Sequence, residues 1–248
     1  MANVIELTHD TATACVLPGV GMNCFSLAFD GVETLYAEPG FDAGDKRASS
    51  GGIPILFPFP GRIKGQTMAW RGRNYAVGGD TVTGNAIHGF CHTRPWTVTD
   101  RQADRVTAVF DSAKADGDLG DRWPSSFALT ATYRLSVDAL SLKLTMANTG
   151  DEDLPCGLGL HPYFLVPPGG ANVGDADAAR RDEVRVRLPA ETKWRMQEMI
   201  ATGKGLPAVT KQAQLVEIMG RHLSDAVSGG ASPQAAMDAA AEELRDLL

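Results

Sequence analysis

The sequence predicts an all-β fold, a large antiparallel β-sandwich over residues 1–205, followed by a helical tail over residues 206–248. Three observations support this prediction. Short runs of alternating apolar and polar residues recur between Gly, Asp and Pro turns, which is typical of half-buried strands. No segment before about residue 205 has helical periodicity, and from about residue 209 the apolar spacing becomes helical. We therefore expect two domains, the second a two-helix tail.

The N-terminal third reads as a series of hairpins. Residues 4–7, 14–17 and 24–29 are short apolar runs, and Asp30-Gly31 is a strong turn signal before the strand at 32–36. The small, polar residues 38–50 are expected to form a mobile loop.

Further hairpins follow in the middle of the chain. The expected strands there are 68–70 with 74–77, 95–99 with 105–110, and 127–135 with 139–147. The last of these strands places Leu140, Leu142, Leu144 and Met146 on one face.

The tail has a different texture. Apolar residues at helical spacing fill residues 209–227, Gly229-Gly230 ends that helix, and Ser232-Pro233 begins an Ala-rich last helix. This pattern weakly resembles the end of the periplasmic sugar-binding proteins of ABC importers. The switch from strands to helices suggests a junction between two unrelated pieces.

Composition narrows the classes of function. The net charge of -7, without a basic run, argues against a nucleic-acid partner, and no apolar stretch is long enough to suggest a membrane partner. The N-terminus lacks the basic and apolar regions of a signal peptide. The four cysteines, which form no CxxC pair, are interpreted as reduced, so a cytoplasmic location is expected; the oligomeric state stays open.

Three stretches carry candidate site residues. Gly84–Phe90 and Gly157–Phe164 each present a histidine, His88 and His161, after small residues and before aromatic ones. The proline-rich stretch 51–63 cannot be helical, because Pro54, Pro58 and Pro60 remove backbone donors; it ends near Arg62. A lone histidine or arginine is more often structural, so the three motifs matter together.

In order and wording these motifs resemble the arginine and two histidine motifs of the aldose 1-epimerase (galactose mutarotase-like) family, over residues 3–205. The resemblance implies a many-stranded β-sandwich and a small-molecule aldose substrate. It implies His161 as general acid to the ring oxygen, His88 as a sugar-orienting residue and Arg62 as a contact to sugar hydroxyls. It implies no cofactor.

Anomer exchange also needs a base to remove the proton of the C1 hydroxyl. The family's base is a glutamate near its C-terminus, in a part where this chain departs from the pattern. Acidic residues near or after that point match no motif, so the base is unassigned: Asp182, Glu183, Glu191, Glu217, Asp225, Glu242 and Glu243. The sequence thus predicts an aldose 1-epimerase of impaired activity.

Three alternatives stay open. One is a non-catalytic carbohydrate-binding protein, and another is a truncated chain without function. The third is a hexose-6-phosphate 1-epimerase, which would need a basic cluster such as Arg47, Lys64, Arg71 and Arg73. A zinc site of His88, Cys91, His92, Cys156 and His161 is disfavoured, because the spacing matches no common zinc pattern; no metal is expected.

Overall fold

The computed structural model describes residues 3–79, 83–115, 119–166 and 168–170, together with Ala235, Ala239 and Glu242. The chain divides into two compact units, residues 1–183 and 184–248. In the second unit the three described residues are helical and exposed. The rest of the expected helical tail lies outside the described residues, as do Asp182, Glu183, Glu191, Glu217, Asp225 and Glu243.

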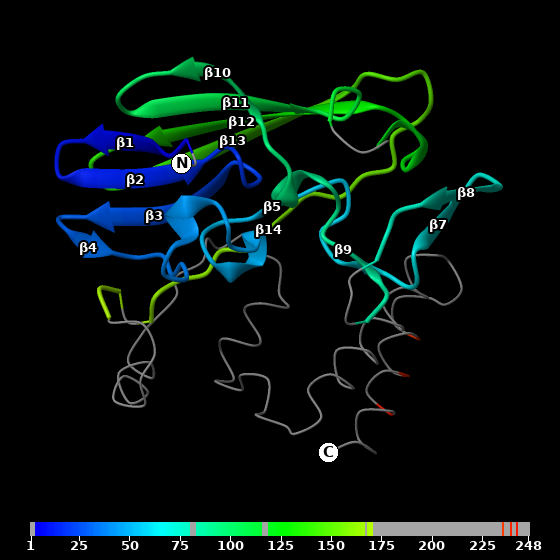
Figure 1. Cartoon of the computed structure of the whole chain (residues 1–248), viewed down its shortest axis with the longest axis horizontal. Coiled ribbons are helices and arrows are strands. Elements are labelled where there is room, and N and C mark those ends of the chain that lie inside the picture. Colours follow the sequence, from blue (N-terminus) through cyan, green and yellow to red (C-terminus); the bar gives the residue numbers. More distant parts are fainter. Residues whose placement is uncertain are drawn as a thin grey trace. The chain divides into compact units, whose positions relative to one another are not determined.

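Two antiparallel four-stranded sheets form the body of the first unit (Figure 1). One sheet contains β1 (Ile5–His9), β2 (Ala12–Leu17), β3 (Asn23–Phe29) and β4 (Val32–Glu33) in that order. The other contains β10 (Thr97–Arg101), β11 (Arg105–Asp111), β12 (Phe127–Leu135) and β13 (Leu140–Asn148). Every neighbouring pair is antiparallel and consecutive in sequence, so the connections are hairpins, as the turn signals indicated.

The core lies between the two sheets. Strands β1 and β2 contact β11 and β12, and alternate residues of each strand are buried. The buried set contributed by β1, β11 and β12 includes Ile5, Leu7, Val106, Phe110, Leu129 and Tyr133. Alternate residues along the strands thus point from one face of each sheet into a shared apolar layer. Two sheets packed in this way form a β-sandwich.

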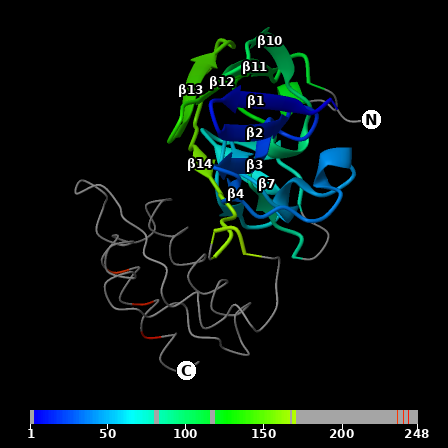
Figure 2. The same ribbon diagram turned by 90° about the vertical axis from the view of Figure 1, so that its left-hand side faces the viewer.

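Strand β13 is the outer strand of its sheet in the described part of the chain (Figure 2). Leu140, Leu142 and Leu144 are half-buried, whereas Met146 on the same face is 47% exposed. The apolar layer is thus less completely covered at this edge than over β12. Other apolar residues are exposed elsewhere in the first unit, among them Leu160, paired with Ile55, and Phe164, which forms a bridge with Leu35.

Three two-stranded pairs connect the sheets to the candidate site (Figure 1). They are β5 (Ile55–Leu56) with β14 (Gly159–Leu160), β6 (Arg62–Ile63) with β9 (Ala86–Ile87), and β7 (Thr67–Trp70) with β8 (Arg73–Ala76). Short 3-10 turns complete the described elements: η1 (Phe41–Ala43), η2 (Ala48–Ser50), η3 (Cys91–Thr93) and η4 (Leu119–Asp121).

Residues 38–50, for which a mobile loop was expected, connect β4 to β5 and contain two short 3-10 turns. This segment forms η1 and η2, because Phe41 is 2% exposed and its ring packs 5.5 Å from that of Phe25. The buried Phe41 ring and the Asn23 side chain, which donates to the Ala48 carbonyl, both attach this segment to the core. The four cysteines are free thiols. Among the described residues, no helix has the length and apolar character needed to cross a bilayer.

Candidate active site

His88 is held rigidly at the end of β9. Its backbone has a positive φ of 63°, and its N–H donates to the Gly61 carbonyl at 2.9 Å. Nδ1 of the ring lies 2.7 Å from the Pro60 carbonyl oxygen. Because a carbonyl can only accept, Nδ1 carries the proton, and the neutral ring leaves its lone pair on Nε2.

The residue after His88 must be glycine. Gly89 has φ 70° and forms a parallel bridge with Phe57, and a Cβ there would collide with the Phe57 carbonyl. Phe90 N–H donates to the same carbonyl at 2.8 Å. The glycine thus allows the histidine turn to lie directly against the proline-rich stretch.

His161 follows β14, which pairs with β5 of the same proline-rich stretch. The backbone N–H of His161 donates to the Pro54 carbonyl at 3.2 Å, and that of Tyr163 donates to the Gly52 carbonyl at 2.9 Å. The Tyr163 ring packs 4.8 Å from the His161 ring, measured between centroids. His161 itself is exposed, so its imidazole can reach a ligand.

The structure brings His88, His161 and Arg62 together. The two imidazole centroids are 6.1 Å apart, with an angle of 60° between the ring planes. Arg62 lies on β6, opposite Ile87 of β9, and it is exposed. Burial lowers the pKa of His88, and the charges of His161 and Arg62 lower it further, against the raising effect of the Pro60 hydrogen bond. Arg62 is therefore close enough for its charge to reach the His88 ring.

A third histidine extends this group inward. His92, on η3, is 9% exposed and its ring lies 5.8 Å from that of His88. Burial, followed by the charges of His88 and Arg94, lowers the pKa of His92 to about 4. His92 is neutral at physiological pH, which the sequence did not indicate.

The electrostatic surroundings of these histidines are basic. Every charged side chain that shifts the pKa of His88 or His92 is a histidine or an arginine. In the described part of the chain, no group of three His, Cys, Asp or Glu side chains could hold a metal ion. Of the three residues described in the tail, Glu242 is acidic, and it is exposed on a helix.

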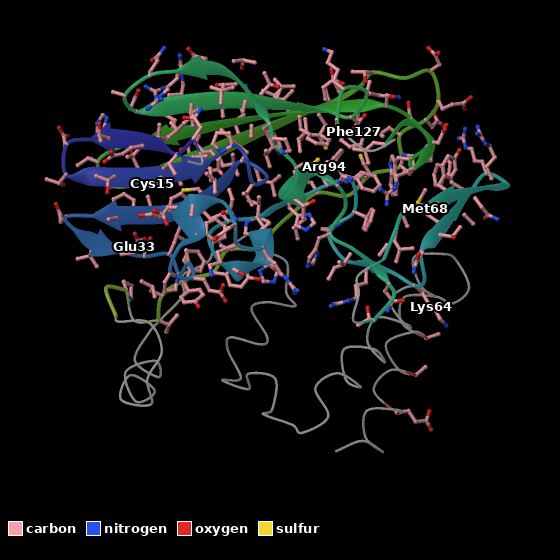
Figure 3. All side chains as sticks on the ribbon, in the orientation of Figure 1. Cys15, Glu33, Lys64, Met68, Arg94 and Phe127 are labelled. Atoms are coloured by element: carbon pink, nitrogen blue, oxygen red, sulfur yellow. The ribbon has the colours of Figure 1, made fainter. Side chains whose placement is uncertain are left out.

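The basic residues suggested from sequence as a phosphate cluster lie elsewhere. Arg71 pairs with Asp153 and packs over Trp70, and Arg73 packs over Tyr75 of the same hairpin. Figure 3 shows Met68 on this hairpin and Lys64 nearby, whereas Arg94 lies beside η3. Arg47 precedes η2. The arginine whose charge acts on His88 is Arg62, and the one whose charge acts on His92 is Arg94; only Arg62 was a sequence candidate.

A two-layered antiparallel sandwich of this kind, with two histidines and an arginine on loops beside it, is a galactose mutarotase-like fold. The family model of the aldose 1-epimerases matches residues 3–219, and this chain belongs to that family. The match continues past residue 205, where the resemblance was expected to end.

Two solved structures and one curated relative illustrate the similarity. The Slr1438 protein of Synechocystis is 27% identical with a TM-score of 0.57, over 66% of this chain and 55% of that chain. A galactose mutarotase-like protein of Clostridium acetobutylicum is also 27% identical with a TM-score of 0.57, over 66% of this chain and 51% of that chain. The uncharacterized protein YphB of Escherichia coli is 26% identical over 114 residues, which is 46% of this chain and 37% of YphB. The matched part of this chain thus spans about half the length of the solved relatives, and less of the curated one.

Proposed function

We propose that this chain acts on an aldose and catalyses exchange between its α- and β-anomers, as an aldose 1-epimerase. The observation that carries the proposal is the 6.1 Å separation of the His88 and His161 rings, with the Arg62 charge beside them. The two histidines come from different family motifs, and both rings are accessible enough to meet one sugar. Glucose and galactose are the first substrates to test.

In this proposal His161 is the general acid that protonates the ring oxygen, since histidine ordinarily titrates near neutral pH. His88 orients the sugar: with Nδ1 bound to the Pro60 carbonyl, Nε2 of its neutral ring accepts a hydrogen bond from a sugar hydroxyl. The Arg62 guanidinium offers several donors to sugar hydroxyls. No cofactor is required for these proton transfers.

The base that removes the C1 hydroxyl proton is unassigned. The charged side chains that shift the pKa values of His88 and His92 are histidines and arginines. These pKa shifts therefore point to no described carboxylate as the base. Loss of one member of an acid–base pair typically lowers the rate ~10²–10⁴-fold. We therefore propose that this chain is a slow epimerase whose sugar affinity is less affected than its rate.

The proposal extends to organisation and location. We infer that residues 1–205 form the sugar-binding sandwich and that residues 206–248 are a helical tail of separate origin. We also infer a cytoplasmic location, since the four cysteines are free thiols, as is usual in a reducing compartment.

Magnetisation-transfer NMR of glucose and galactose anomers tests the function. We expect weak exchange that is abolished by His161→Ala and unchanged by His9→Ala, a matched loss of an imidazole on β1. Exchange that survives His161→Ala would contradict the acid role. Turnover as fast as that of an epimerase with both acid and base, lost in His161→Ala, would instead show that an unassigned carboxylate reaches the C1 hydroxyl.

A second function, carbohydrate binding without catalysis, is favoured by the same basic surroundings. Arg62 and both histidines can hold a sugar by hydrogen bonds without a base. Saturable binding of galactose with no anomer exchange above the rate in buffer would support this alternative.

A further inference from the structure

A cavity of about 250 Å³ lies beside the histidines and plays no part in the proton transfers above. Ile87 and Gly89, the neighbours of His88 in sequence, line it, as does His92. Arg94 and Arg122 line it as well, and none of its described lining residues is acidic.

The two arginines gather around one aromatic ring. The guanidinium carbons of Arg94 and Arg122 lie 5.9 Å and 5.6 Å from the centroid of Phe90. Arg94 Nη1 donates to the Phe90 carbonyl at 3.1 Å, and Arg122 Nε donates to the Ala76 carbonyl at 3.0 Å. Burial, followed by the charge of Arg122, lowers the pKa of Arg94. Two like charges are thus held near each other by the fold, and an anion between them would relieve that repulsion.

A glycine makes room for one of them. Gly78 has φ 79°, and a Cβ at this position would collide with Arg122 Nη2. The guanidinium therefore packs where any other residue would have a side chain. This close packing fixes the direction of Arg122 toward the cavity it lines.

His92 supplies a further polar group. Its side chain is nine-tenths buried, and its Nδ1 has no hydrogen-bond partner in the described part of the structure. A buried polar atom without a partner costs free energy unless a ligand or water satisfies it. Because the ring lines the cavity, its resonances report on an anion that binds there.

We propose that this cavity binds the oxyanion of an anionic aldose, such as a phosphate carried by the exocyclic carbon C6 or a carboxylate formed by that carbon. The placement on the sugar rests on the proposed function, in which His161 protonates the ring oxygen and the His88 ring lies 6.1 Å from that of His161. The exocyclic carbon is attached to C5, which bonds to that oxygen, so its substituent is close to His88. Guanidinium groups recognise phosphate and carboxylate by paired, charge-assisted hydrogen bonds.

The direct experiment uses inorganic phosphate on the whole chain and does not depend on catalysis. NMR of ¹³C,¹⁵N-labelled histidines follows the His92 ring while phosphate is added. We expect saturable shifts, with a Kd that rises roughly 10–100-fold in Arg122→Met, as for loss of a charged hydrogen-bond donor. Absence of saturable shifts, or an unchanged Kd in Arg122→Met, would overturn the proposal.

Two further variants separate charge from folding. Gly78→Ala keeps both charges but displaces the Arg122 guanidinium, so phosphate should bind more weakly. Because φ 79° disfavours alanine, the circular dichroism spectrum and urea unfolding of this variant check that it is folded under the conditions of the titration. Arg73→Met removes an arginine stacked on Tyr75, away from the cavity lining, and should leave the phosphate Kd unchanged. Equal weakening by Arg73→Met would show a general charge effect and contradict a specific site.

Activity then distinguishes the sources of the oxyanion and the two proposals. kcat/KM for anomer exchange is compared for a hexose 6-phosphate, a hexuronate and the neutral hexose, in the unaltered chain and in Arg122→Met. A preference for one anionic sugar that is lost in Arg122→Met identifies the substituent. Exchange of the neutral hexose without any phosphate binding would contradict the cavity proposal and leave the epimerase proposal standing. Phosphate binding at His92 without exchange of any sugar would contradict the epimerase proposal and support the anion site.

Discussion

The imidazole rings of His88 and His161 lie 6.1 Å apart although their motifs are separated by both strands of the β12–β13 hairpin. The proline-rich stretch between Pro54 and Gly61 joins them. His161 donates its backbone N–H to Pro54 at one end, and His88 donates its own to Gly61 at the other. One segment that cannot be helical thus sets the separation of the two proposed sugar contacts.

Gly89→Ala should destabilise the fold strongly. The new Cβ would collide with the Phe57 carbonyl, which belongs to the backbone and cannot rotate away, and φ 70° disfavours alanine. Overpacking and left-handed strain together suggest a loss of about 3 kcal/mol in the free energy of unfolding. Urea unfolding measures this loss. Gly120→Ala, where no atom lies within 4 Å of the added Cβ, is the control and should change stability little.

Asn23→Ala should loosen the start of the proline-rich stretch. Asn23 is fully buried; its Nδ2 donates to the carbonyls of Ala48 and Gly51 at 3.2 Å and 3.0 Å, and its Oδ1 accepts from Ile53 N–H at 2.7 Å. Alanine leaves these buried groups without partners, at a cost of about 3 kcal/mol. Thermal unfolding compares it with Asn74→Ala at an exposed position. Equal stabilities of the two variants would refute this role.

The sandwich should become less stable as the pH is lowered, because the unfolded chain protonates His92 more readily than the folded one does. The folded pKa of about 4 lies below the ordinary value of 6.5, so the unfolded chain takes up this proton first as pH falls. The free energy of unfolding is therefore unaffected by the titration of His92 above pH 6.5. It decreases between pH 6.5 and about 4, by at most about 3 kcal/mol. Urea unfolding at pH 7 and pH 4.5 is compared in the unaltered chain and in His92→Gln. An identical pH dependence in both would contradict the assignment.

Arg62→Met should weaken sugar binding without affecting the fold. Arg62 is exposed, so its loss should change the free energy of unfolding by no more than about 0.5 kcal/mol. Loss of one charged donor should raise the sugar Kd roughly 10-fold or more. NMR titration with galactose measures the Kd, and Arg101→Met, an exposed arginine on β10, serves as control. A Kd unchanged in Arg62→Met would exclude contact with the sugar.

Much of the architecture could be predicted from the sequence because strands and tight turns depend on neighbouring residues. The alternation in β12 and the Asp30-Gly31 turn after β3 are local signals, and the structure agrees with both. Local reasoning did not indicate the contact of Phe41, in residues 38–50, with Phe25, because that contact joins residues far apart in the chain. For the same reason the sequence did not indicate that Arg94 and Arg122 line a cavity with His92.

The sequence by itself determined that the chain is a β-sandwich of the aldose 1-epimerase family, and it singled out Arg62, His88 and His161. Only the tertiary structure decided how these side chains lie, since β5–β14 and β6–β9 pair residues far apart in the chain. It also decided that His92 is buried and neutral and that Arg94 and Arg122 share the ring of Phe90. The physical reason is that burial and charge proximity are properties of packed neighbours, and no spacing along the chain encodes which distant segments become neighbours.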